Sequence, residues 1–262
     1  MLRIGVVGWG AIGQGVGEAL AAGAAPEARL CAVLRRPASA SRAPAPEGVG
    51  LHTDLESFLG ADLDCVLEAG GGECLRLIGE RVLERGATLV VMSTAALAEE
   101  GFRNRLIAAA RRGGAKILAP SGALAGLDAV SAAAVGGLSR VALTQSKPPA
   151  ALLPEAEAAT LSEPKQLAAL SIREAGAQFP KNANIAVGLG LAAGDLDAAQ
   201  ARIVADPRLA RNCVEYEVEG AFGRLTVRLE SEPSANQRTS QMAIYSALAA
   251  LRRASEPLVI GA

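Results

Sequence analysis

The feature that most constrains this chain is its N-terminus, where an apolar segment runs directly into a glycine-rich turn. Residues 2–7 are mostly apolar, as expected for a strand buried on both faces. The spacing Gly-x-Gly-x-x-Gly follows at once, and apolar residues then recur at helical spacing. Such a unit binds a dinucleotide, because glycine lets the pyrophosphate approach the backbone and the helix start supplies free amides. We therefore predict cofactor contacts from Gly8, Gly10, Ala11, Ile12 and Gly13.

Strand-like and helix-like segments alternate over the first 120 residues. The expected strands lie at 2–7, 30–34, 65–69, 88–92 and 116–118. This alternation is typical of an α/β Rossmann domain with a doubly wound parallel sheet, which we place at residues 1–119.

The pattern then changes to that of an α+β domain with a largely antiparallel sheet, at residues 120–239. Its signals are a strand at 139–147 and apolar–polar alternation at 214–229 around two glycines. A last amphipathic helix, about 240–253, is expected to pack back on the first domain.

Composition argues against several functional classes. The 262 residues carry a formal net charge of −1, whereas a nucleic-acid binder usually has a basic excess. No apolar run reaches the ~18 residues of a membrane span. The N-terminal apolar stretch is interrupted by glycines and Glu18, unlike a secretory signal, so we expect a cytoplasmic protein with a small-molecule substrate.

The residues that usually ligate metals are sparse. The four cysteines have neither a Cys-x-x-Cys pair nor zinc spacing, and we interpret them as buried thiols: Cys31, Cys65, Cys74 and Cys213. The single histidine, His52, precedes the third expected strand and is interpreted as a surface or loop residue. We therefore expect no metal site and no Ser-His-Asp arrangement.

The end of the second expected strand bears on the choice between NAD and NADP. NAD sites place an acidic residue there to bind the ribose hydroxyl. This chain has Arg35 and Arg36 instead, and a guanidinium pairs well with a 2′-phosphate. We predict a preference for NADP over NAD, with dual use as one alternative. Another is that one arginine merely stacks on the adenine or points to solvent.

Several motifs, in order along the whole chain, resemble the L-aspartate dehydrogenase family. Besides the glycine turn, they are Pro120-Ser121-Gly122-Ala123, Gly126-Leu127-Asp128, Lys147-Pro148-Pro149, Phe179-Pro180-Lys181-Asn182-Ala183-Asn184, Ala205-Asp206-Pro207, Arg211-Asn212, Gly220-Ala221-Phe222-Gly223 and Asn236-Gln237-Arg238-Thr239-Ser240.

The resemblance implies hydride transfer between NAD or NADP and L-aspartate, giving iminosuccinate or oxaloacetate, in some members for NAD synthesis. It also implies a dimer formed through the second domain's sheet. Ala123 and Asn184 would contact the nicotinamide half of the cofactor, and we add Ala69 and Gly70, at the end of the third expected strand, as cofactor candidates.

The chain departs from the family pattern at its catalytic residue. The family reads Asn-x-His after Ala-Asp-Pro, whereas this chain reads Asn212-Cys213-Val214, so Val214 stands at the histidine position. Loss of a general acid/base costs ~10²–10⁴-fold, so we expect weakened deamination. Lys147 and Tyr216 are candidate substitute proton donors, and each is alternatively structural or carboxylate-binding.

The substrate's carboxylates need cationic or hydroxyl partners. The candidates are Lys147, Arg238, Thr239 and Ser240, although Thr239 or Ser240 could equally be an N-cap of the last helix. Two alternative functions stay open: an imine reductase or reductive aminase for another oxo acid or amine, and a cofactor-binding paralogue without catalysis. We expect a homodimer, because the antiparallel sheet should have an apolar face that one helix layer leaves uncovered.

Overall fold

The computed structural model describes residues 1–36, 44–179, 183–232 and 240–260. The chain divides into two compact units. The first contains Met1–Gly122 together with Ala243–Ala262, and the second contains Ala123–Met242. The second unit is therefore inserted between the body of the first unit and that unit's last helix.

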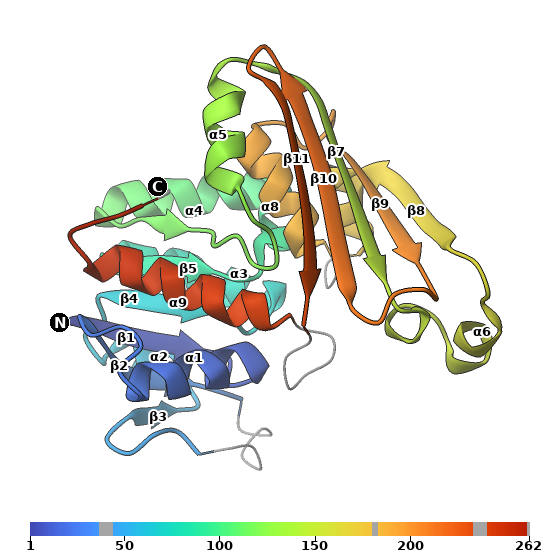
Figure 1. The fold of residues 1–262 in the computed structure, drawn as a ribbon. Helices are drawn as coiled ribbons and strands as arrows, with labels where there is room; N and C mark the ends of the chain where they lie inside the picture. The colour runs from blue at the N-terminus through green and yellow to red at the C-terminus, as the bar shows by residue number, and fades with distance from the viewer. Residues whose placement is uncertain (37–43, 180–182, 233–239, 261–262) are drawn as a thin grey trace. The chain divides into compact units, whose positions relative to one another are not determined.

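The first unit is built on a six-stranded parallel sheet in the order β3-β2-β1-β4-β5-β6 (Figure 1). This is the strand order of a Rossmann fold, so the predicted fold class is confirmed. The strands are β1 (Leu2–Val7), β2 (Ala28–Leu34), β3 (Gly50–His52), β4 (Cys65–Glu68), β5 (Thr88–Val91) and β6 (Ile117–Leu118). The sequence analysis missed the short strand β3, and His52 lies on this edge strand rather than in a loop.

Helices cover both faces of this sheet. They are α1 (Ala11–Ala21), α2 (Leu55–Leu59), α3 (Gly72–Glu84), the 3₁₀ helix η2 (Thr94–Ala98), α4 (Glu100–Gly113) and α9 (Gln241–Ser255). One apolar cluster joins β1 to α1 and α9, and includes Ile4, Val6, Val16, Ile244 and Ala247. The last helix thus completes the core of the first unit.

The second unit is built on a five-stranded mixed sheet in the order β11-β10-β7-β9-β8. Its strands are β7 (Leu138–Lys147), β8 (Lys165–Ser171), β9 (Gln200–Ala205), β10 (Asn212–Gly220) and β11 (Gly223–Ser231). All neighbouring pairs are antiparallel except β7 and β9, which run parallel. The helices are α5 (Leu127–Val135), η3 (Pro149–Ala151), α6 (Glu155–Thr160), α7 (Ile172–Gln178) and α8 (Asn184–Ala193).

The two faces of this sheet differ in chemistry. The face contacted by α5 and α8 buries Val141, Leu143, Tyr216 and Val218. The opposite face carries cross-strand ion pairs, among them Arg228 Nη1 with Glu215 Oε1 at 2.7 Å and Arg224 Nη2 with Glu219 Oε1 at 2.9 Å. Helices of the same unit cover this face at β7 and β10, whereas Leu225, Val227 and Leu229 on β11 stay half-buried, so the expectation of an uncovered apolar face fails for the middle strands.

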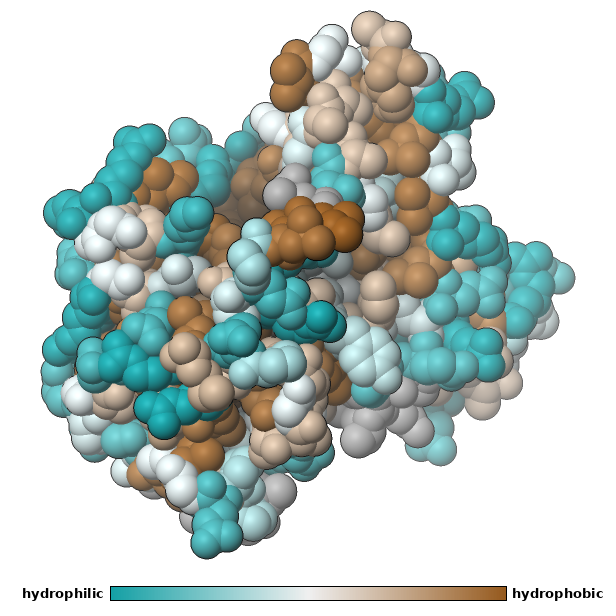
Figure 2. Space-filling view, turned by 60° about the vertical axis from the view of Figure 1, so that its left-hand side comes forward, coloured by the Kyte–Doolittle hydropathy of each residue, from teal (hydrophilic) through white to brown (hydrophobic). Residues whose placement is uncertain are grey.

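Figure 2 shows one face of the molecule, on which hydrophilic and apolar residues are intermixed. Large exposed apolar residues occur at separate places in the sequence, such as Leu77, Val135 and Phe222. Within the described ranges, every helix is too short or too polar to cross a lipid bilayer.

Candidate functional site

The glycine turn after β1 is shaped by close backbone contacts. Gly8 has a φ of +93°, and a Cβ there would lie 2.6 Å from the carbonyl oxygen of Ala69. A Cβ on Gly13 would lie 2.0 Å from the carbonyl oxygen of Gly8. Both positions therefore require glycine, and the start of α1 lies directly against the turn.

The first turn of α1 leaves its backbone amides available. Gly10 occupies the N-cap position and provides no side-chain cap. The side-chain amide of Gln14 donates to the carbonyl oxygen of Trp9 at 3.0 Å, which fixes the turn from the helix side. The N–H groups of Ala11, Ile12 and Gly13 have no acceptor within the helix, so they are suited to bind a phosphate.

The loop after β4 lies beside this turn. The backbone N–H of Ala69 donates to the carbonyl oxygen of Val7 at 2.8 Å. The Cα of Gly70 would be 2.7 Å from a Cβ on Gly8. The structure therefore brings the predicted cofactor residues Ala69 and Gly70 together with Gly8.

Glu68, at the end of β4, is a buried carboxylate that the sequence analysis missed. Its Oε1 accepts hydrogen bonds from the N–H groups of Gly70 (2.8 Å) and Gly71 (2.9 Å) and from the hydroxyl of Ser93 (2.9 Å). Its Oε2 accepts from the N–H of Ser93 at 3.1 Å. Burial raises the pKa of Glu68, and the four donors oppose that shift. The side chain thereby connects the loops that follow two adjacent parallel strands.

The two arginines after β2 differ in their surroundings. The backbone N–H of Arg35 donates to the carbonyl oxygen of His52 at 3.0 Å, and its Nη1 is buried without a hydrogen-bond partner. Arg36 is exposed. An unpartnered buried guanidinium nitrogen is costly unless an anion binds it. This nitrogen and the glycine turn fit the phosphate groups of a dinucleotide.

In the second unit, the three candidate catalytic residues share one face of the sheet. Val214 and Tyr216 are two residues apart on β10, and both are buried. Val214 pairs with Gln145 on β7, and Lys147 lies two residues further along that strand, on the same face.

The environments of Tyr216 and Lys147 favour different roles. The Tyr216 hydroxyl donates to the carbonyl oxygen of Ala125 at 2.5 Å, and burial raises its pKa to about 12. This favours a structural role for Tyr216. Burial lowers the pKa of Lys147, which makes its ammonium a better proton donor than an exposed lysine.

The remaining candidates lie at segment starts. Ala123 is buried at the beginning of the second unit, and Asn184 is the first residue of α8. Ser240 is buried, and its Oγ accepts from the N–H of Met242 at 3.1 Å, which supports the N-cap alternative. Arg238 and Thr239 lie outside the described residues.

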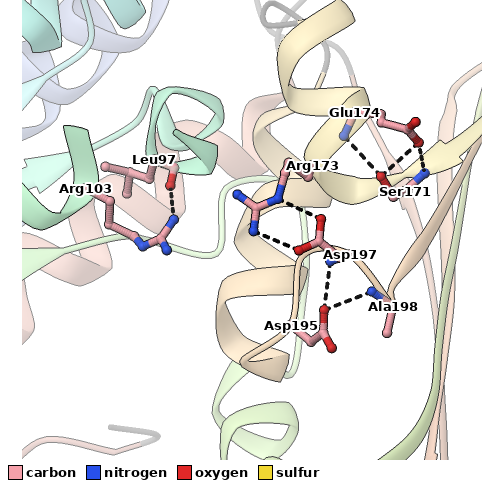
Figure 3. A network of polar contacts seen from close by, with 8 residues as sticks. All are labelled: Leu97, Arg103, Ser171, Arg173, Glu174, Asp195, Asp197 and Ala198. Atoms are coloured by element: carbon pink, nitrogen blue, oxygen red, sulfur yellow. Dashed lines mark hydrogen bonds and ion pairs between the residues drawn. The ribbon is translucent and has the colours of Figure 1, made fainter. Parts of the chain in front are cut away.

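A polar network fixes the segments around α7 and α8 (Figure 3). Ser171 and Glu174 form a capping box at the start of α7. Arg173 forms a two-pronged ion pair with Asp197, whose N–H donates to Asp195 at 2.7 Å. In the first unit, Arg103 donates to the carbonyl oxygen of Leu97 at 2.7 Å. These contacts order helix ends and contain no group poised for chemistry.

No cluster of metal-ligating side chains occurs within the described part of the chain. The four cysteines are free; Cys65 and Cys213 are buried, whereas Cys31 and Cys74 are half-buried. His52 is paired with the Ser57 hydroxyl at 3.0 Å and packs edge-on against Phe58.

Two family models match the chain, and they meet near the boundary between Gly122 and Ala123, although the second model continues over α9, which the structure assigns to the first unit. Residues 8–120 match the family described as "Homoserine dehydrogenase, NAD binding domain". Residues 128–254 match "Aspartate dehydrogenase, C-terminal".

Curated relatives match along the full chain. The chain is 35% identical to L-aspartate dehydrogenase of Methanosarcina barkeri, with 100% of both proteins covered. It is 36% identical to L-aspartate dehydrogenase 2 of Bordetella bronchiseptica, with 99% of both covered.

Solved structures give the same fold. The crystal structure of aspartate dehydrogenase from Thermotoga maritima superposes with a TM-score of 0.80 at 24% identity, with 99% of both chains covered. Dihydrodipicolinate reductase from Paenisporosarcina superposes with a TM-score of 0.58 at 13% identity, covering 97% of this chain and 95% of that one. At these identities, the structures support the fold alone.

Proposed function

The chain belongs to the L-aspartate dehydrogenase family, and we propose that it is an NAD(P)-dependent oxidoreductase acting on the CH–NH₂ group of L-aspartate. The reaction takes L-aspartate and the oxidised cofactor to iminosuccinate, the reduced cofactor and a proton. Water then converts iminosuccinate to oxaloacetate and ammonia. The observation that carries this proposal is the full-length similarity, at 35%, to an L-aspartate dehydrogenase.

The residues of the first unit would bind and orient the cofactor. The free amides at the start of α1 would hold the pyrophosphate, and Gly8 and Gly13 leave room for it. When bound, the nicotinamide supplies the hydride acceptor or donor. Glu68 keeps the loop at Ala69 and Gly70 beside the turn, where those residues can contact the cofactor.

The finer proposal is a preference for NADP over NAD. It is supported by the buried, unpartnered Nη1 of Arg35 at the end of β2, where an NAD site would have an acidic residue. A hydrogen bond to a charged group contributes roughly 1.5–3 kcal/mol, or about 10–150-fold in affinity.

Titration of cofactor fluorescence tests this preference. Arg35→Ala should weaken NADPH binding by about 10-fold or more and leave NADH binding nearly unchanged. Arg29→Ala, an exposed arginine at the other end of β2, is the matched control and should change neither affinity. Equal affinities of the unmodified protein for NADPH and NADH contradict the preference.

The second finer proposal is weakened deamination, because Val214 cannot transfer a proton. Release of ammonia requires proton transfers that a family histidine would assist, and hydride transfer itself requires only close approach of the reacting carbons. Lys147 is a buried cation on the same sheet face as Val214, so it is the first candidate for a substitute proton donor.

Steady-state assays separate this function from its alternatives. NADPH oxidation with oxaloacetate and ammonia is expected, together with slow oxidation of L-aspartate. Turnover only with other oxo acids or amines would instead identify an imine reductase of different specificity. Cofactor binding without turnover of any of them would identify a non-catalytic protein.

We also propose a homodimer in the cytoplasm. The dimer is supported by the family resemblance and no longer by an uncovered apolar face. Sedimentation of the full chain at micromolar concentration tests it, and a monomer there contradicts it.

A further inference from the structure

The helix-covered face of the second sheet changes from apolar to polar along its strands. Its first rows are apolar: Val218 pairs with Val141, and Tyr216 pairs with Leu143. The next row contains Val214 opposite Gln145. Continuing the same register places Lys147 beside Asn212, which pairs with Ser231 on β11. The polar end of this face therefore surrounds Val214.

Two of these polar side chains are largely buried, and one of them has a fully buried polar atom without a partner. Gln145 and Ser231 are each 5% exposed. The Oγ of Ser231 has no hydrogen-bond partner. Within the part of the chain that the structure describes, the side-chain amide of Gln145 makes no hydrogen bond, and its atoms keep some accessible surface. Buried polar groups are nearly always satisfied in native proteins, so the Ser231 hydroxyl requires an explanation, and the Gln145 amide on the same face is available to a ligand.

The chemistry of this polar end is that of a donor set. The Ser231 hydroxyl, the Gln145 amide and the Lys147 ammonium all donate hydrogen bonds. Along the described strands of this face, no Asp or Glu side chain is present to accept them. Several donors with a cation among them are matched by a carboxylate, whose two oxygens accept about four hydrogen bonds.

We propose that Gln145 and Ser231 are substrate-binding residues that, beside Lys147, hold a carboxylate of a dicarboxylate substrate next to Val214. This inference rests on the proposed function, because that function supplies a substrate with two carboxylates. It assigns roles to two residues that no sequence motif marks. It also explains why, on this face of β7, the apolar side chains of Val141 and Leu143 are followed by glutamine and lysine.

The alternative is that Gln145 and Ser231 serve only the fold. The two roles predict opposite effects of removing the polar groups. Replacing an unsatisfied buried polar group with an apolar one leaves stability unchanged or improves it. A residue that supports the fold would lower the melting temperature when removed.

The test measures binding of succinate, a dicarboxylate with no group to oxidise, to the NADP-saturated protein by calorimetry. Gln145→Leu and Ser231→Ala should each weaken succinate binding by about 10-fold or more, with NADPH affinity unchanged and Tm unchanged or higher. Ser146→Ala is the matched control, because Ser146 lies between Gln145 and Lys147 but faces the other side of the sheet. If a leucine variant misfolds, Gln145→Glu provides a second test, since its charge should repel succinate.

The outcomes separate the inference from the function. Variants that bind succinate as tightly as the unmodified protein refute the inference, as does an unmodified protein that binds no succinate. Turnover of L-aspartate in either of those cases leaves the proposed function standing. Weakened succinate binding in the variants, without turnover of aspartate or oxaloacetate by any protein, supports the dicarboxylate site and refutes the function.

Discussion

Substitution of Val214 by histidine should restore the proton shuttle that the family resemblance implies at this position. General acid/base catalysis contributes ~10²–10⁴-fold, so we expect kcat for L-aspartate to rise by about 10²-fold, or roughly 2.7 kcal/mol of barrier. The same change replaces an apolar side chain that is 2% exposed and paired with Leu229 and Gln145. Burying the ring should cost about 1–3 kcal/mol of stability, and the Gln145 amide opposite offers the imidazole one hydrogen bond.

The assay is kcat for L-aspartate as a function of pH, with Val214→Gln as the control. Glutamine is similarly polar but does not titrate, so only the histidine variant should gain activity as the pH rises through the imidazole pKa, near 6.5 in model peptides. The reasoning is refuted if the unmodified protein is already fast or if glutamine gives the same gain. The proton would then have to come from elsewhere, with Lys147 as the first residue to replace.

Three further substitutions test the geometry. Glu68→Gln leaves one of four donors facing an NH₂ group, so it should cost about 1–3 kcal/mol of stability and weaken dinucleotide binding, measured by denaturant unfolding and fluorescence titration. Folding raises the pKa of Glu68 above its unfolded value near 4.5. Protonation of Glu68 therefore stabilises the fold fully below that pH, and this stabilisation is lost as the pH rises through the folded pKa. The glutamine variant should lack this pH dependence. Tyr216→Phe removes the hydrogen bond to Ala125 and should cost about 0.5–1.5 kcal/mol with kcat unchanged, whereas a large loss of kcat at constant stability would restore a catalytic role. Gly13→Ala places a methyl group 2.0 Å from the Gly8 carbonyl oxygen. Thermal unfolding followed by circular dichroism should therefore show a less stable protein, and fluorescence titration should show weaker dinucleotide binding. Dinucleotide affinity equal to that of the unmodified protein would contradict the close packing of turn and helix.

The glycine turn could be predicted from sequence because its geometry is local. Strand, turn and helix follow one another within about twenty residues, and the contact that requires glycine at position 13 is with Gly8 in the same turn. The contact of Gly8 with Ala69, in contrast, comes from a distant part of the chain. The doubly wound parallel sheet was predicted from the alternation of strand-like and helix-like segments, without its strand order. β3 was missed because it has only three residues, and β8 because alanines blur its apolar–polar alternation.

The site in the second unit could be predicted only in part. Val214 and Lys147 were predicted as site residues from the family motifs, and that prediction stands untested, whereas Gln145 and Ser231 lie in no motif. The register of β7 with β10 places Gln145 opposite Val214, 69 positions further along the chain (214 − 145). The β10–β11 hairpin brings Ser231 to the same end of the face. Glu68 was missed for a similar reason, since Ser93 lies 25 residues away. Its only sequence signal is an acidic residue ending an apolar strand.

The position of α9 has a consequence for synthesis of the protein. Residues Ile244, Ala247, Ala250 and Leu251 belong to the same apolar cluster as Ile4 and Val6, although some 240 residues separate them. During translation, the first unit cannot complete its apolar core until α9 has been synthesised. Residues 123–242, in contrast, can fold before α9 leaves the ribosome. We therefore expect the nascent chain to bind a dinucleotide only after α9 has been synthesised. A variant that lacks residues 243–262 should leave the first unit incompletely folded and bound to chaperones.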